Sequence, residues 1–163
     1  MSERLVESLR SAGLSIAVAE SLTGGMVASE LAAVAGASDV FLGGVVAYSN
    51  AAKSSILGVS SQSLESFGAV SDDVALQMAQ GVQEVFAVAS GLTLNDVIGV
   101  ATTGVAGPAQ SESKKVGTVF IAVRLGERSL VQSFHFDGDR QHIRECSCQE
   151  AIALVEQLLK SAL

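Results

Sequence analysis

The feature that most constrains the fold is a set of three short apolar stretches, LSIAVAES at 14–21, GGVVAYS at 43–49 and NDVIGVATT at 95–103. Their apolar residues are nearly continuous rather than alternating, which is typical of strands that are covered on both faces. Segments with helical spacing separate the three stretches. Strands that alternate with helices predict a parallel sheet between two helical layers.

The later part of the chain adds strands of a different kind. GTVFIAVRL at 117–125 and RSLVQSFHF at 128–136 are rich in β-formers, and Gly126-Glu127 between them predicts a hairpin. A hairpin requires at least one antiparallel strand. We therefore predict an α/β fold: a three-layer α/β/α sandwich with a mixed, mostly parallel sheet of about five strands, in a single domain spanning 1–163.

Capping residues predict where the helices begin and end. A helix is expected from about Thr23 to Val34, directly after the first apolar stretch. Asn50 is expected to cap a short helix that ends at Gly58, and Ser71 to cap a longer one. Asp139 is expected to cap a terminal helix. These helices would fill the two outer layers of the sandwich.

Composition narrows the classes of function. Apolar residues make up 48% and charged residues 17% of the chain, which argues against disorder. The net charge is 10 − 17 = −7 without a Lys/Arg cluster, so we expect no nucleic-acid partner. The apolar stretches are too short to span a bilayer, and the first residues do not resemble a signal peptide, so we expect a cytoplasmic protein without a membrane partner. The apolar content is high for a small acidic domain, and an apolar surface of this kind would be compatible with a homodimer.

Cysteine and histidine residues cluster near the end of the chain but in no familiar pattern. Cys146 and Cys148 are two residues apart in the predicted terminal helix, so their side chains point to different sides and a disulfide is not expected. Together with His135 and His142 they match no known spacing of metal ligands. We expect neither a metal nor a cofactor.

Three polar clusters follow the three apolar stretches: ESLTGG at 20–25, YSNAAK at 48–53 and TTGVAGP at 102–108. In an open α/β sheet, ligands bind outside the carboxyl ends of the strands. Because parallel strands bring these ends to one edge, the three clusters are expected to meet there. Three polar clusters at one edge are stronger evidence for a binding site than any one cluster alone.

Ser21 in the first cluster has two interpretations. In one, Ser21 or Thr23 only caps a helix, and Gly24-Gly25 allow close packing. In the other, Ser21 Oγ is a nucleophile, and free N–H groups around Thr23 and Gly24 form an anion-binding end that stabilises an oxyanion. No G-x-S-x-G motif is present, and neither histidine is predicted at this edge, so a Ser-His-Asp triad is not expected.

Lys53 is the candidate base for Ser21. A lysine in the first turn of a helix opposes the positive end of the helix dipole, and burial also disfavours its charged form, so both lower its pKa. The alternative is an ordinary surface lysine. Tyr48, the only tyrosine of the chain, either is a core aromatic with its hydroxyl at the rim or bridges Ser21 and Lys53 or stacks on a ligand.

The third cluster and the terminal helix supply candidate substrate-binding groups. Gly104, Ala106 and Gly107 could form a backbone cradle, although the cluster is neither G-x-G-x-x-G nor a Walker loop, and an ordinary turn explains it as well. Arg140 in DGDR lies at the predicted start of the terminal helix. It is either an exposed helix-start arginine or a ligand for a phosphate or carboxylate.

Five ordered motifs resemble the C-terminal domain of the CinA family, which also occurs alone as nicotinamide-nucleotide amidohydrolase. These motifs are AESLTGG, GGVVAYSNAAK, GAVSDDV, TGVAGP followed by VGTVFIA, and FDGDR, and the similarity runs from about Ala19 to the terminal helix. The resemblance implies a three-layer α/β/α fold. It implies hydrolysis of the carboxamide of nicotinamide mononucleotide (NMN) to nicotinic acid mononucleotide and ammonia, with Ser21 and Lys53 as the serine–lysine pair and Tyr48 as their neighbour.

The chain departs from the family pattern in two places. Ala51 stands where the family commonly has an acid, and the loop 107–115 lacks the usual glycine run and has Lys115 where proline is common. Two other functions therefore stay open: a non-catalytic CinA-like module that binds a nucleotide or a protein, and an amidohydrolase for another small amide. The partner expected from the resemblance is a small nucleotide substrate.

Overall fold

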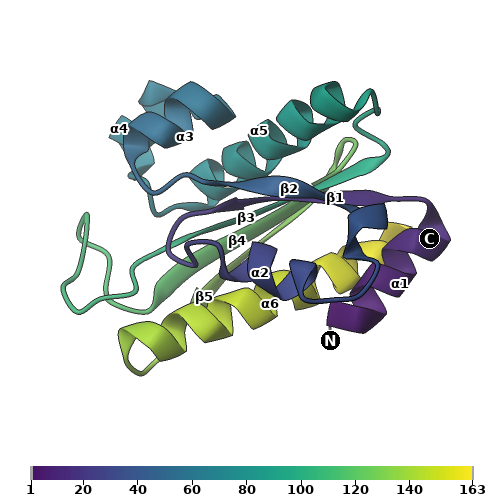
Figure 1. Cartoon of the computed structure of the whole chain (residues 1–163). Coiled ribbons are helices and arrows are strands. Elements are labelled where there is room, and N and C mark those ends of the chain that lie inside the picture. The colour runs from purple at the N-terminus through teal and green to yellow at the C-terminus, as the bar shows by residue number, and fades with distance from the viewer. Residues whose placement is uncertain (1, 163) are drawn as a thin grey trace.

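The computed structural model of the chain describes residues 2–162, which form one five-stranded sheet with helices on both faces (Figure 1). The strands are β1 (Ser15–Glu20), β2 (Phe41–Val46), β3 (Val97–Gly104), β4 (Thr118–Leu125) and β5 (Arg128–His135). The helices are α1 (Ser2–Ala12), α2 (Met26–Ala32), α3 (Asn50–Leu57), α4 (Ser61–Phe67), α5 (Asp72–Ser90) and α6 (Arg140–Ala162), with a short 3₁₀ helix η1 (Ala37–Asp39). Within residues 2–162, none of the helices combines the length and the hydropathy that a membrane-spanning helix requires.

The strand order is β2-β1-β3-β4-β5. Strand β1 pairs in parallel with β2 and β3, whereas β4 pairs antiparallel with both β3 and β5. Only β4 is therefore reversed, and the other four strands run in one direction. This confirms the predicted mixed, mostly parallel sheet and the hairpin between the last two strands.

The helices form two layers that bury different faces of the sheet. In Figure 1, α3, α4 and α5 lie above the sheet, and α1, α2 and α6 lie below it. Successive residues of β1 serve the two sides, because side chains alternate along a strand. Ile16 and Val18 pack in the core with α1, α2 and α6, whereas Ala17 and Ala19 pack in the core with α5. Burial on both faces explains why this strand is apolar at every position from Ile16 to Ala19.

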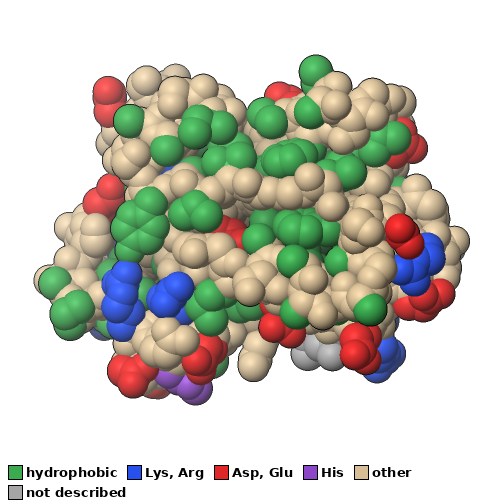
Figure 2. All heavy atoms as spheres, in the orientation of Figure 1, with side chains coloured by type: hydrophobic (Ala, Val, Ile, Leu, Met, Phe, Trp, Pro, Cys, Tyr) green, Lys and Arg blue, Asp and Glu red, His purple; other side chains and the backbone are tan. Residues whose placement is uncertain are grey.

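The edge strand β2 is less buried than β1 and β3. Its residues are half-buried or exposed, and Val46 at its end is 52% exposed. Figure 2, in the same orientation, shows hydrophobic side chains gathered along this edge of the sheet. The inner position of β1 and the edge position of β2 therefore account for the difference in burial between two stretches that look alike in sequence.

Two predicted helix boundaries are wrong. Ser49, not Asn50, caps α3, because the Ser49 hydroxyl accepts a hydrogen bond from the Ala52 N–H at 3.1 Å. Helix α2 begins at Met26 rather than Thr23, because a turn precedes it. Gly24 and Gly25 have φ angles of 58° and 99° in that turn, and residues other than glycine rarely adopt such backbone angles. The predicted caps Ser71 and Asp139 are confirmed by their bonds to the N–H groups of the next turn.

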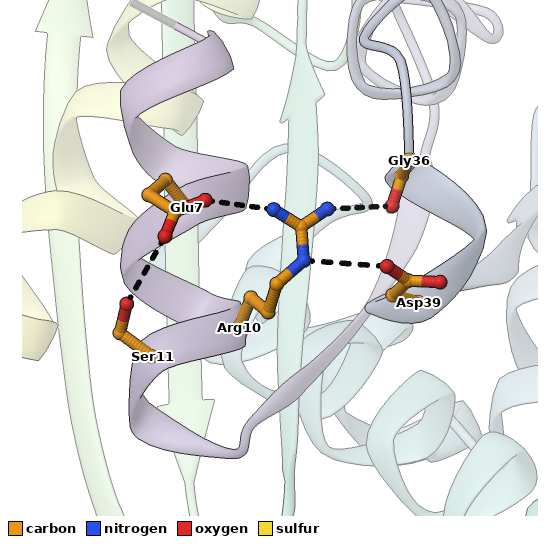
Figure 3. A network of polar contacts seen from close by, with 5 residues as sticks. All are labelled: Glu7, Arg10, Ser11, Gly36 and Asp39. Carbon is orange, nitrogen blue, oxygen red and sulfur yellow. Dashed lines mark hydrogen bonds and ion pairs between the residues drawn. The ribbon is translucent and has the colours of Figure 1, made fainter.

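A polar network joins α1 to η1 near the start of β1 (Figure 3). Arg10 donates hydrogen bonds to Glu7 at 2.7 Å, to Asp39 at 3.2 Å and to the Gly36 carbonyl at 3.1 Å. Glu7 also accepts a bond from Ser11. Exposed ion pairs of this kind stabilise a fold by at most about 1 kcal/mol each, so the network orients α1 more than it holds the domain together.

Candidate active site

A cavity of about 210 Å³ opens where β1, β2 and β3 end. Of the residues predicted to form a site, the structure brings six to its lining: Ser21, Tyr48, Lys53, Gly104, Ala106 and Arg140. They come from four separate parts of the chain. Polar groups that follow β1, β2 and β3 therefore meet at the carboxyl ends of these strands, as expected.

Ser21 and Lys53 are in direct contact at the base of the cavity. Lys53 Nζ lies 3.2 Å from Ser21 Oγ, within hydrogen-bond distance. Ser21 is only 8% exposed and Lys53 only 3% exposed. Few lysine side chains are buried to this extent, so the surface-lysine interpretation of Lys53 is wrong. A serine hydroxyl paired with a buried amine has the geometry required for proton transfer.

Burial changes the protonation of Lys53. Dehydration of the amine lowers its pKa from the ordinary lysine value, while the carboxylate of Glu112 partly opposes this by raising it. Lys53 is the fourth residue of α3, one position further from the cap than expected, so the helix dipole acts on it more weakly. Dehydration is therefore the main reason why the neutral, proton-accepting form of Lys53 becomes accessible.

The turn after β1 does not offer the predicted anion-binding end. The buried carboxylate of Glu20 accepts hydrogen bonds from the N–H groups of Gly25, Val27 and Ala28 at 2.8–3.1 Å. The N–H of Gly24 is also used, because it donates to the Ser21 carbonyl at 3.1 Å. The prediction of a free N–H at Gly24 is therefore wrong. The start of α2 already holds a negative charge from its own chain.

Thr23 also lies away from the cavity lining. Its hydroxyl is fully buried and contacts the Thr102 hydroxyl at 2.7 Å, which joins this turn to β3. Among residues 2–162, the backbone N–H groups of Leu22 and Thr23 donate to no other group. Leu22 lines the cavity. Because Thr23 is outside the lining, the Leu22 N–H is the remaining candidate oxyanion donor of the turn.

Tyr48 and Arg140 form the rim of the cavity. Arg140 donates to the Tyr48 hydroxyl and to the Gly107 carbonyl, both at 2.7 Å. Tyr48 is 60% exposed, and its hydroxyl faces Arg140 rather than the Ser21–Lys53 pair. It does not bridge those two residues, which contact each other directly. Gly107 is outside the lining and contributes through its carbonyl, whereas Gly104 and Ala106 face the cavity.

The chain is similar to a known protein family and to solved structures over nearly its whole length. The model of the CinA C-terminal domain matches residues 1–159. The chain belongs to the CinA C-terminal domain family. Among solved structures, a CinA superfamily protein from Klebsiella pneumoniae has a TM-score of 0.89 with 28% identity, over 98% of this chain and 96% of that one. One from Escherichia coli has a TM-score of 0.86 with 32% identity, over 97% and 90%.

Sequence relatives of this CinA domain are considerably longer. CinA-like proteins from Thermotoga neapolitana and Kosmotoga olearia are 44% and 40% identical to it over 98% of this chain. The chain spans 37% of the length of each of these relatives. The similarity therefore covers the whole CinA domain and only about a third of the relatives.

Sequence reasoning missed one charged residue of the CinA domain's cavity, Glu112. It lies in the loop between β3 and β4, four residues beyond the third polar cluster, and lines the cavity together with Ser111. A short bridge between Ser111 and Lys114 and left-handed φ angles of 50° and 62° at Glu112 and Ser113 shape this loop. The only signal in the sequence was the departure of the loop from the family pattern, which indicates no particular residue.

Replacing Glu20 by glutamine is expected to lower the free energy of unfolding of the CinA domain by about 2–4 kcal/mol. A carboxamide has one acceptor oxygen in place of two, so it cannot satisfy all three N–H donors, and it removes the negative charge at the start of α2. Urea unfolding followed by circular dichroism measures the loss. Glu65→Gln, an exposed change on α4, is the control and should leave the midpoint unchanged; equal midpoints for both variants would contradict the role of Glu20.

Proposed function

We propose that this CinA domain is an NMN amidohydrolase, which hydrolyses the carboxamide of NMN to nicotinic acid mononucleotide and ammonia. One observation carries the proposal: a buried serine hydroxyl 3.2 Å from a buried lysine amine whose pKa is lowered by dehydration. A neutral amine beside a hydroxyl is the arrangement that activates a serine without histidine. The family resemblance supplies the choice of substrate.

The proposed reaction uses the two residues in turn. Ser21 Oγ attacks the carboxamide carbon and transfers its proton to Lys53 Nζ. Lys53 then protonates the departing ammonia as the tetrahedral intermediate collapses to an acyl-enzyme. Water, deprotonated by the again neutral Lys53, attacks the ester, and Lys53 returns that proton to Ser21 Oγ as the C–O bond breaks and the acid is released. Each proton that Lys53 accepts is therefore returned within one turnover.

The size of the cavity is consistent with a substrate that is only partly enclosed. Pockets for drug-sized ligands measure roughly 300–1,000 Å³, larger than the 210 Å³ found here. The carboxamide and its ring would occupy the base beside Ser21, and the ribose and phosphate would extend to the exposed rim. Arg140 at that rim is a suitable cation for the phosphate, since a guanidinium binds two phosphate oxygens at once.

Ammonia release from NMN by the purified protein tests the proposal, with nicotinic acid mononucleotide identified as the second product. Nicotinamide and other small amides should be poor substrates, because they lack the groups that reach the rim. Binding of NMN without product would instead indicate a non-catalytic module. Faster ammonia release from a different amide would indicate that the substrate assignment is wrong while the serine–lysine chemistry holds.

Arg140→Ala is expected to raise KM for NMN roughly 10- to 100-fold while kcat changes much less, because a phosphate contact binds substrate and transition state alike. Steady-state kinetics of ammonia release measures both constants. Nicotinamide riboside, which lacks the phosphate, is the matched substrate and should be nearly insensitive to the substitution. Equal losses for NMN and the riboside would show that Arg140 acts through Tyr48 and Gly107 on the shape of the rim instead.

A further inference from the structure

Glu112 brings a negative charge into the same cavity as the Ser21–Lys53 pair. It projects from the loop between β3 and β4, which extends beyond the end of the sheet at the left of Figure 1. One carboxylate oxygen, Oε2, accepts hydrogen bonds from the N–H groups of Ala69 at 2.7 Å and Val70 at 3.4 Å. The other oxygen, Oε1, receives no hydrogen bond from residues 2–162. It is available to a ligand.

Several features hold the Glu112 carboxylate in place. Gly68 allows its close approach, because a Cβ at that position would lie 2.5 Å from Oε2. The backbone of Glu112 is left-handed, with φ of 50°, a conformation that non-glycine residues adopt only where surrounding contacts stabilise it. At its base the loop is also held by the bond from Arg140 to the Gly107 carbonyl. A side chain held in this way is positioned before any ligand binds.

The charges around the cavity are arranged with opposite signs. Arg140 is at the rim, Glu112 is on the loop, and Lys53 is at the base, where dehydration favours its neutral form. When Lys53 is neutral, the charged side chains that remain in the lining are Glu112 and Arg140, and of these two Glu112 is the one whose charge acts on Lys53. Such a site favours a ligand with a positive centre near the scissile amide and a negative group further away.

We propose that Glu112 makes this cavity selective for amides on a cationic aromatic ring, that is, N-substituted pyridinium carboxamides, over amides on a neutral ring. The proposal deepens the proposed function and rests on it for the position of the ring. Oxidised NMN carries its positive charge in the ring that bears the carboxamide. Reduced NMN has the same carboxamide, ribose and phosphate on a neutral dihydropyridine ring, so the two ligands differ in the feature that Glu112 would detect.

The test compares the affinities of oxidised and reduced NMN for Ser21→Ala protein with and without Glu112→Gln, by isothermal titration calorimetry. Glutamine keeps an oxygen that can accept from the Ala69 N–H, so the tether of the loop is preserved while the charge is lost. We expect Glu112→Gln to weaken binding of oxidised NMN about tenfold and that of reduced NMN less than about twofold. Glu65→Gln removes the same charge from exposed α4 and is the matched control.

Salt provides a second readout that a purely structural tether would not change. The preference for oxidised NMN should fall as ionic strength rises in Ser21→Ala protein, because ions screen a partly exposed charge pair. It should be independent of salt once Glu112 is glutamine. A preference that responds to salt equally in both proteins would overturn the proposal.

Equal weakening of both ligands by Glu112→Gln, or no measurable binding of either, would also overturn the role of Glu112. The proposed function is decided separately by ammonia release from wild-type protein. Release of ammonia together with equal weakening would refute only the selectivity by Glu112. A Glu112-dependent preference without ammonia release would refute only the amidohydrolase.

Discussion

Ser21→Ala is expected to lower kcat for ammonia release from NMN by at least about 10⁴-fold, because removal of a nucleophile leaves only the catalysis that binding and oxyanion contacts provide. The Ser21 hydroxyl has one hydrogen-bond partner within residues 2–162, Lys53, so the fold should tolerate its loss. Affinity for NMN should change little. Single-turnover kinetics measures the loss of the chemical step, and mass spectrometry of wild-type protein tests directly for an acyl-enzyme on Ser21.

Ser55→Ala is the matched control for that variant. Ser55 is an exposed serine on α3, two residues beyond Lys53, and within residues 2–162 its hydroxyl bonds only to the Ala51 carbonyl. It should retain the wild-type rate. Near wild-type kcat in Ser21→Ala would mean that water attacks the amide directly and that Ser21 only orients the substrate.

Lys53→Arg is expected to be nearly as inactive as Lys53→Ala, with a loss of at least about 10³-fold in kcat/KM, because a guanidinium does not deprotonate in the accessible pH range. In wild-type protein burial lowers the pKa of Lys53, so its neutral form appears below the pH at which an ordinary lysine deprotonates. The general base is active when neutral. The rate should therefore rise with pH through the lowered pKa of Lys53 and then level off.

A purely electrostatic role for Lys53 predicts the reverse pattern. If the cation stabilised the oxyanion, arginine would restore much of the rate, and wild-type activity would fall as pH rises. The Glu112 carboxylate raises the pKa of Lys53, so Glu112→Gln should move the rising limb of the wild-type profile to lower pH. Measuring kcat/KM against pH for wild type, Lys53→Arg and Glu112→Gln distinguishes the two roles.

Both roles depend on a geometry that local sequence patterns only partly indicate. Ser21 and Lys53 could be nominated from the sequence because each follows an apolar stretch that reads as a buried strand. Parallel strands bring their carboxyl ends together whatever their side chains are, so the topology alone predicted that the two residues approach. The distance of 3.2 Å and the burial of Lys53 depend on how α3 packs over the sheet.

The errors at the turn after β1 have a common cause. The sequence ESLTGG reads as a helix start with free N–H groups, and the glycines suggested an anion site. In the structure the anion is Glu20, the last residue of the strand, which folds back on the first turn of α2. A capping carboxylate five to eight residues before its donors lies outside the usual capping patterns, which place the acceptor next to the helix.

The layers, the mixed sheet, the hairpin and the edge of the sheet where Ser21 and Lys53 meet could all be predicted from the sequence, because they depend on periodicity and on the geometry of parallel strands. The surroundings of the pair depend on tertiary contacts. Arg140 meets Tyr48 across 92 positions of sequence, and Glu112 meets Ala69 across 43. Contacts of that range depend on where an irregular loop and a helix start come to rest in space, and no periodic pattern of residues encodes that position.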